Sequence, residues 1–399
     1  MLKIKIIMKH LIIALIGLLA FSLNLFPQNS IDGVLAEVEK NNTRLSALRK
    51  SAEAEKIGNK TGIYLENPEF EFHYLWGSPT EVGNRTDLSI KQTFDFPSVY
   101  RYQNQISDTR NEQVELEYQK QRRDLILQTR LICSDLVYTN ALKHELSKRL
   151  IQAQRIAVSY KAQFDLGETS ILEYNKSQLN LLSLSKELES LEIERTSLVS
   201  ELTLLNGGMF IDFTDSLFYS PEIPVDFEEW YVVAEQNNPM LNWLKQEVEI
   251  SAKQEKLNRA LSLPKLQAGY MSEKVVGVHL QGVIVGLSIP LWENKNTVKY
   301  ARANALAIES ITSDEKTQFY NRLKALHSKA NSLQKNANDY RLNLLHFDNS
   351  ELLKKALDKG EITLIEYIVE LAFYYESVNQ LLELERELNK TLAELNQYM

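Results

Sequence analysis

The chain has 399 residues, of which 44% are hydrophobic and 25% are charged, and its formal net charge at pH 7 is −8. This composition is typical of a folded protein, and it excludes a disordered chain or one embedded entirely in a membrane. The acidic balance and the lack of a basic face argue against nucleic acid as a partner, because binding to phosphates requires clustered lysine and arginine.

The N-terminus has the pattern of an export signal. Lys3, Lys5 and Lys9 precede an apolar run over 11–26. Translation starts at either Met1 or Met8. The run is too short and too close to the terminus for a membrane span, so the sequence predicts a signal peptide over 1–28. No later stretch of about 18 apolar residues follows, so any later membrane crossing must use strands.

A tandem repeat organises the remaining chain. The segment 36–42 aligns with 232–238, and the same shift of 196 residues carries Pro68 onto Pro264. Further along, Pro97 corresponds to Pro290 and Gly167 to Gly360, with a shift of 193 residues. These four prolines mark equivalent points of the two copies. The sequence therefore predicts a first repeat over 29–207 and a second over 228–399, joined by a linker over 208–227 in an equatorial region.

Each repeat is expected to contain a short helix, two strands and a long helical hairpin. The intervals 98–166 and 291–359 hold 69 residues each without glycine or proline, and a helix of that length extends about 100 Å. Helices over 168–206 and 361–398 follow a glycine in each copy and lead the chain back. Helices of this kind alone would also permit a cytoskeletal or motor-type coiled coil.

The segments before the long helices alternate between apolar and polar residues. The alternation predicts strands over about 68–77 and 86–96 in the first repeat and about 264–274 and 279–290 in the second. Transmembrane barrels and soluble sandwiches both contain strands with one apolar and one polar face. Four strands cannot close a barrel, for which about eight are needed, so a membrane-spanning form of this chain must be an oligomer.

Local marks in the same order in both repeats support a family resemblance. They are Asn41-Asn42, Asn237-Asn238-Pro239, the segment Ser288–Asn294 and the two Gly-Glu turns. With these marks and the repeated hairpins, nearly the whole mature chain resembles the TolC family of outer-membrane efflux proteins. The resemblance implies a mainly α fold with a small β part. Three subunits would share a β-barrel of twelve strands, four per chain, continued by a periplasmic α-barrel.

The resemblance also implies a function and partners. The chain would be a subunit of a homotrimeric channel in the outer membrane, in contact with its lipid and with a long periplasmic portion. It would act as a passive exit duct of a tripartite efflux or secretion system, for metal cations or small toxic compounds. Its partners would be a periplasmic adaptor protein and an inner-membrane pump of the resistance-nodulation-division type, and no cofactor is expected.

The residues that the resemblance assigns to function lie at the helix reversals. The tips that meet the adaptor would be Leu166, Gly167 and Glu168 in the first repeat and Lys359, Gly360 and Glu361 in the second. A glycine just past a long helix also has a structural role, since it supplies the left-handed cap that a tight reversal needs. Glu173 and Glu366 are candidates for a pore constriction, with an ordinary solvated helix-surface glutamate as the alternative. Val369 stands where the family has a further acidic residue.

Enzyme chemistry is not expected. The only cysteine, Cys133, lies in a helical pattern, which predicts a buried and inert thiol, and the histidines show no metal-ligand spacing. No phosphate-binding loop or nucleophile motif occurs, so neither a catalytic nor a metal site is predicted. The competing interpretations are a periplasmic adaptor-like protein and a secreted coiled-coil scaffold.

Overall fold

The computed structural model describes residues 30–219 and 222–399, so the predicted signal peptide lies outside the described residues. The chain forms two compact units. Unit 1 consists of the described residues up to Leu45 together with Arg122–Tyr231 and Arg322–Met399, and unit 2 consists of Ser46–Gln121 and Val232–Asn321. Each unit draws on both repeats, so the compact units do not coincide with the repeats seen in the sequence.

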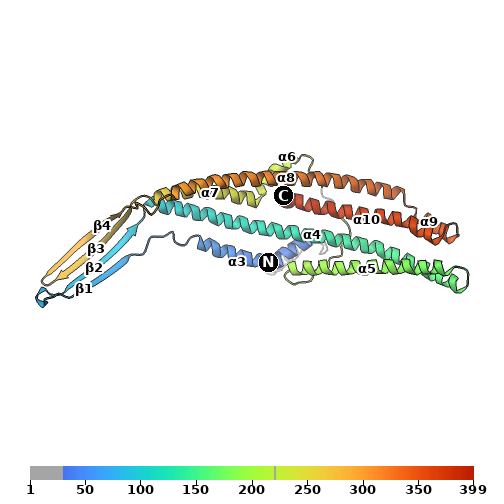
Figure 1. Ribbon diagram of the computed structural model, residues 1–399, viewed down its shortest axis with the longest axis horizontal. Coiled ribbons are helices and arrows are strands. Elements are labelled where there is room, and N and C mark those ends of the chain that lie inside the picture. The colour runs from blue at the N-terminus through green and yellow to red at the C-terminus, as the bar shows by residue number, and fades with distance from the viewer. Residues whose placement is uncertain (1–29, 220–221) are drawn as a thin grey trace, which may run out of the picture. The chain divides into compact units, whose positions relative to one another are not determined.

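Helices make up most of the described chain (Figure 1). Among the residues that the structure describes, no helix is long and apolar enough to span a bilayer. The helices are α2 (Ile31–Asn41), α3 (Thr43–Gly58), α4 (Pro97–Asp165), α5 (Ile171–Leu205), α6 (Phe227–Asn237), α7 (Pro239–Ala260), α8 (Thr297–His346), α9 (Ser350–Asp358) and α10 (Leu364–Leu395).

Asparagine caps explain the Asn marks at the start of each repeat. The Asn42 side chain accepts the N–H of Leu45 at 2.7 Å, and α2 gives way to α3 at this residue. Asn238 likewise separates α6 from α7 and accepts the N–H of Met240 at 2.9 Å, with Pro239 as the first residue of α7. The short helix expected in each repeat is therefore a pair of helices with a capped break.

The prediction of one unbroken helix over 291–359 is wrong. The helix α8 begins only at Thr297, after a left-handed Asn296 with φ of 68°. It ends at His346, and three residues, 347–349, separate it from α9. In the break, the Asp348 carboxylate accepts the N–H of Ser350 at 3.0 Å. Aspartate and asparagine make such turns without glycine or proline, so the lack of these two breakers does not guarantee a continuous helix. In the first repeat, α4 is continuous over Pro97–Asp165, close to the predicted range 98–166.

Unit 2 contains an antiparallel four-stranded sheet in the order β1-β2-β3-β4 (Figure 1). The strands lie close to their predicted positions. Pro68 and Pro264 directly precede β1 and β3, Pro290 lies two residues past the end of β4, and Pro97 opens α4. The strands are β1 (Glu69–Leu75), β2 (Arg85–Phe94), β3 (Lys265–Val275) and β4 (Val278–Ser288).

The two faces of the sheet differ in polarity. Phe70, Ile90, Tyr270 and Val283 are direct neighbours across the four strands and form one apolar row. All four side chains are exposed. The opposite face contains ion pairs, with Lys91 to Glu71 at 2.7 Å and Arg85 to Asp87 at 2.8 Å. The alternation in the sequence thus becomes an exposed apolar face and a polar face.

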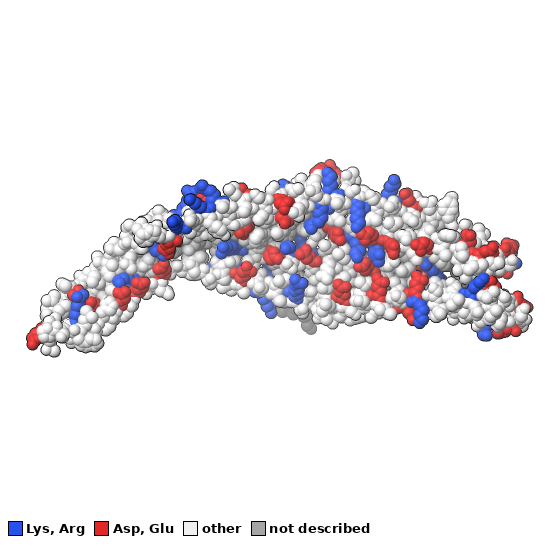
Figure 2. All heavy atoms as spheres, in the orientation of Figure 1, with Lys and Arg blue, Asp and Glu red and all other residues white. Residues whose placement is uncertain are grey.

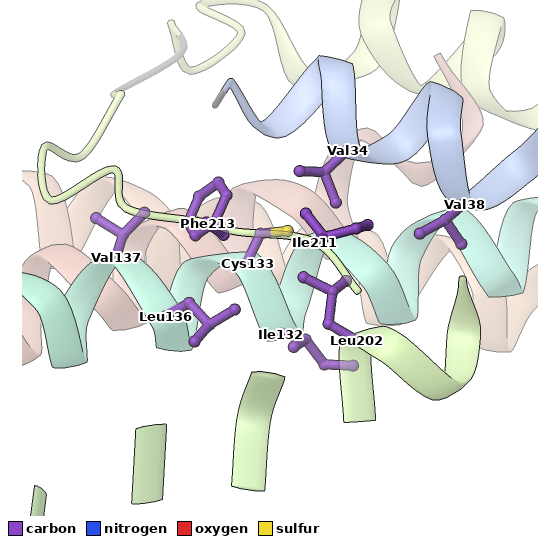
Figure 3. Packing of buried hydrophobic residues seen from close by; sticks show 9 residues of the cluster. All are labelled: Val34, Val38, Ile132, Cys133, Leu136, Val137, Leu202, Ile211 and Phe213. Atoms are coloured by element: carbon purple, nitrogen blue, oxygen red, sulfur yellow. The ribbon is translucent and has the colours of Figure 1, made fainter. Parts of the chain in front are cut away.

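Unit 1 has an apolar core in which α2, α4 and α5 meet the segment 207–219, which we call the strap (Figure 3). Cys133 on α4 is fully buried there, and burial raises the pKa of its thiol to about 12. The predicted burial of Cys133 is confirmed. The core residues are Val34, Val38, Ile132, Cys133, Leu136, Val137, Leu202, Ile211 and Phe213.

Candidate functional site: the helical hairpin tips

The first hairpin of unit 1 joins α4 to α5 through a reversal centred on Gly167. This glycine has φ of 76°, a left-handed conformation that costs little without a Cβ atom. Its N–H donates to the Phe164 carbonyl at 3.0 Å, and the N–H of Glu168 donates to the Gln163 carbonyl at 2.8 Å. These two bonds form a Schellman motif, which satisfies the last carbonyls of α4 and ends the helix.

The second hairpin repeats this geometry between α9 and α10. Gly360 has φ of 73°, and its N–H donates to the Leu357 carbonyl at 3.0 Å. The N–H of Glu361 donates to the Ala356 carbonyl at 2.9 Å. The structure therefore places all six predicted tip residues in two equivalent helix reversals. They are Leu166, Gly167, Glu168, Lys359, Gly360 and Glu361, and all are exposed.

The two constriction candidates occupy the third position of the returning helices. The Ser170 hydroxyl accepts the N–H of Glu173 at 3.2 Å, and the Thr363 hydroxyl accepts the N–H of Glu366 at 3.3 Å. The Glu366 carboxylate in turn accepts the N–H of Thr363 at 2.7 Å, which completes a capping box and lowers the pKa of Glu366. Each glutamate is thus held by the start of its own helix, one turn beyond a tip.

Glu173 differs from Glu366 in its partners. One of its carboxylate oxygens pairs with Lys176 at 2.8 Å, whereas the other is buried with no hydrogen-bond partner among the described residues. Neighbouring aromatic rings, Phe164 and Tyr174, stack with centroids 5.3 Å apart across the reversal. The first tip therefore packs more tightly around its glutamate than the second, in which Glu366 is exposed.

Polar contacts join the two hairpins of unit 1 behind the tips. Arg149 on α4 is only 5% exposed, and its guanidinium donates to the Asn379 side-chain oxygen on α10 at 2.9 Å. The same guanidinium lies 4.2 Å from the ring centroid of Tyr375, and its removal from water lowers the pKa of Arg149. One turn away, the Gln152 amide donates to the Tyr367 hydroxyl. These contacts cannot be predicted from the sequence, since an arginine in a long polar helix carries no signal of burial.

Metal-ligating side chains do not cluster in this region. Within 30–219 and 222–399, no group of three or more histidine, cysteine, aspartate or glutamate residues is placed to hold a metal ion.

The repeated β-hairpin and long helical hairpin define the fold class of the chain. No protein-family model matches the sequence, and no curated protein matches it. Solved structures do match. The CmeC outer membrane channel of Campylobacter jejuni has a TM-score of 0.76 at 13% identity, over 92% of this chain and 85% of that one.

Two further structures have the same fold. CusC, whose structures concern the conformational changes that accompany folding and transmembrane channel formation, has a TM-score of 0.76 at 14% identity, over 94% of each chain. The open state of the MtrE outer membrane channel of Neisseria gonorrhoeae has a TM-score of 0.70 at 11% identity, over 93% of this chain and 88% of that one. The chain has the fold of outer-membrane channels, and the fold expected from the resemblance to the TolC family is confirmed.

Proposed function

We propose that the chain is one subunit of an outer-membrane channel and serves as a passive exit duct in a tripartite efflux or secretion system. The observation that carries the proposal is the exposed apolar face of the sheet in unit 2. Val283 and Val285 on β4 are 83% and 85% exposed and lie on the same face as the exposed Phe70 and Phe72. A continuous apolar face of this kind is unfavourable in water and suits contact with lipid.

The edges of the sheet support an oligomer. In the part of the chain that the structure describes, β1 and β4 each pair on one side only. Exposed strand edges are templates for further pairing, and closing the sheet would leave no edge. Three copies with four strands each would supply twelve strands, more than the roughly eight that a barrel requires. A homotrimer with the apolar face toward outer-membrane lipid satisfies both requirements.

The hairpin tips are the proposed contact with the rest of the system. They are exposed, and Figure 2 shows acidic side chains gathered at the ends of the two hairpins, on the right of the view. We propose that these tips meet a periplasmic adaptor protein that connects the channel to an inner-membrane pump of the resistance-nodulation-division type. In the same assembly, Glu173 and Glu366 would line the constriction of the pore, where carboxylates attract cations. The proposed cargo is metal cations or small toxic compounds.

Membrane extraction tests the channel against a secreted scaffold. We expect the protein in the outer-membrane fraction, resistant to high salt and released by detergent as a trimer that conducts ions in planar bilayers. The physical reason is that salt weakens exposed ion pairs but leaves apolar contact with lipid intact. Release by salt alone, as a species without conductance, would contradict the proposal and favour the scaffold.

Cross-linking tests the role of the tips. Cysteine at Glu168 or Glu361 is expected to form a cross-link with a co-expressed periplasmic adaptor, because both side chains are exposed at the helix reversals. The buried native Cys133 contributes little background. The matched control is cysteine at the exposed Glu201 near the far end of α5, which should not react. Strong cross-linking from position 201, with none from the two tips, would show that the adaptor binds elsewhere.

A further inference from the structure

A groove lies beside the break between α8 and α9 in unit 1. It has a volume of about 430 Å³ and is bounded by the end of α8, the start of α9 and the facing side of α10. Small-molecule sites in proteins commonly measure about 300–1,000 Å³. Its aromatic lining consists of Tyr340, Phe347, Phe373 and Tyr374.

The helix break that borders the groove has no counterpart in the first hairpin. The break at 347–349 corresponds to 154–156 in the first repeat, where α4 continues as a regular helix. The break exposes Phe347, which is 63% exposed, while Phe373 on α10 is 69% exposed. Two aromatic side chains at the groove are therefore accessible to a ligand from solvent, beside the half-buried Tyr374.

The charge of the groove is negative. Asp339 and Glu370 line it, and its lining includes no lysine or arginine. Neither carboxylate has an ion-pair partner among the residues that the structure describes. A third carboxylate, Asp348, lies in the break itself, and hydrogen bonds from Ser350 and Tyr374 lower its pKa, so it is ionised at neutral pH.

We propose that this groove binds an amphiphilic organic cation, a ligand with a planar aromatic body and a positive charge. The aromatic rings supply flat apolar surface for the body and attract the cation through their faces, and the carboxylates supply the opposite charge. A bare metal ion fits the groove less well, since two carboxylates from different helices offer too few ligands. The inference goes beyond the proposed duct, because it places a binding site on one wall of the chain and needs no transport to be tested.

Direct titration tests this site on the full mature chain purified in detergent. Ethidium, an aromatic monocation, is expected to bind saturably by fluorescence anisotropy, whereas the aromatic anion fluorescein is not. The double variant Asp339→Asn with Glu370→Gln should weaken ethidium binding about fivefold or more at low salt, because it removes both charges but keeps the shape. Phe373→Leu should weaken it about threefold or more, as expected for the loss of one cation–π contact.

Two controls make the result decisive. Glu309→Gln removes an exposed carboxylate of α8 outside the groove and should leave ethidium binding unchanged. Asn343→Cys, in the lining of the groove, should react with a maleimide in the assembled protein, with the buried Cys133 as a silent background. The proposal is overturned if fluorescein binds as well as ethidium, or if the charge-removing variant binds ethidium normally. Protection of the new cysteine would also overturn it, since a second copy of the chain would then cover the groove.

Discussion

Replacing Val283 and Val285 with arginine is expected to abolish stable insertion of the protein into the outer membrane. Both side chains are more than four-fifths exposed on the apolar face of the sheet, where the cross-strand neighbours of Val283 and Val285 are Tyr270 and Ala268. An arginine on the lipid-facing side of a membrane strand costs about 2–4 kcal/mol near the middle of the bilayer. The two substitutions together should therefore reduce the detergent-extractable trimer in outer-membrane fractions to a small remnant.

Gln267→Arg is the matched control. Gln267 lies on β3 between Thr93 and Gly286, on the opposite face of the same sheet. This face already carries charged residues such as Lys91 and Glu71, so one more charge should leave the trimer intact. Insertion that survives both valine substitutions would rule out lipid contact for the apolar face. Equal loss in the Gln267 variant would mean that the substitutions simply unfold the sheet.

The parts of the fold that sequence predicts well are those set by local periodicity. Strand alternation depends only on which side of the backbone each residue faces, so the row of Phe70, Ile90 and Val283 follows from the pattern once the strands pair. The tip reversals are similarly local, because a glycine after a long helix favours the left-handed cap seen at Gly167 and Gly360. Whether these tips contact an adaptor stays a prediction.

Other features depend on contacts between distant segments, and the sequence carries little trace of them. The burial of Arg149 is set by Tyr375 and Asn379, more than 200 positions away in the chain. The break at 347–349 depends on a turn in which the Asp348 carboxylate accepts a backbone N–H. In the sequence, an aspartate at this position is equally compatible with a continuous helix. The groove beside it results from that break and from α10, so neither segment alone predicts it.

The strap is the clearest case of a segment whose role the sequence conceals. The repeat boundaries predict only a linker over 208–227, yet Ile211 and Phe213 enter the core of unit 1 between α2 and α4 (Figure 3). The Phe213 carbonyl also accepts hydrogen bonds from Asn140 and Arg195, each at 3.3 Å. The strap is thus fixed to α4 and α5 by both its side chains and its backbone.

Phe213→Ala is therefore expected to lower the free energy of unfolding by about 3–5 kcal/mol, the range found for truncation of buried aromatic side chains. Phe213 is fully buried, and its loss would leave a cavity beside Cys133 and Leu136. Thermal or urea unfolding of the purified protein in detergent would measure the loss. The same cavity should make the Cys133 thiol reactive toward a maleimide under conditions in which the wild-type thiol is protected.

Phe210→Ala provides the comparison within the same segment. Phe210 is 69% exposed, three residues before Phe213, so its truncation removes few contacts and should change the free energy of unfolding by less than about 0.5 kcal/mol. A large effect at Phe213 with little at Phe210 would establish that the strap stabilises unit 1 by filling its core. Equal small effects would mean that the strap detaches without loss of the core, and the linker predicted from the sequence would then be the better description.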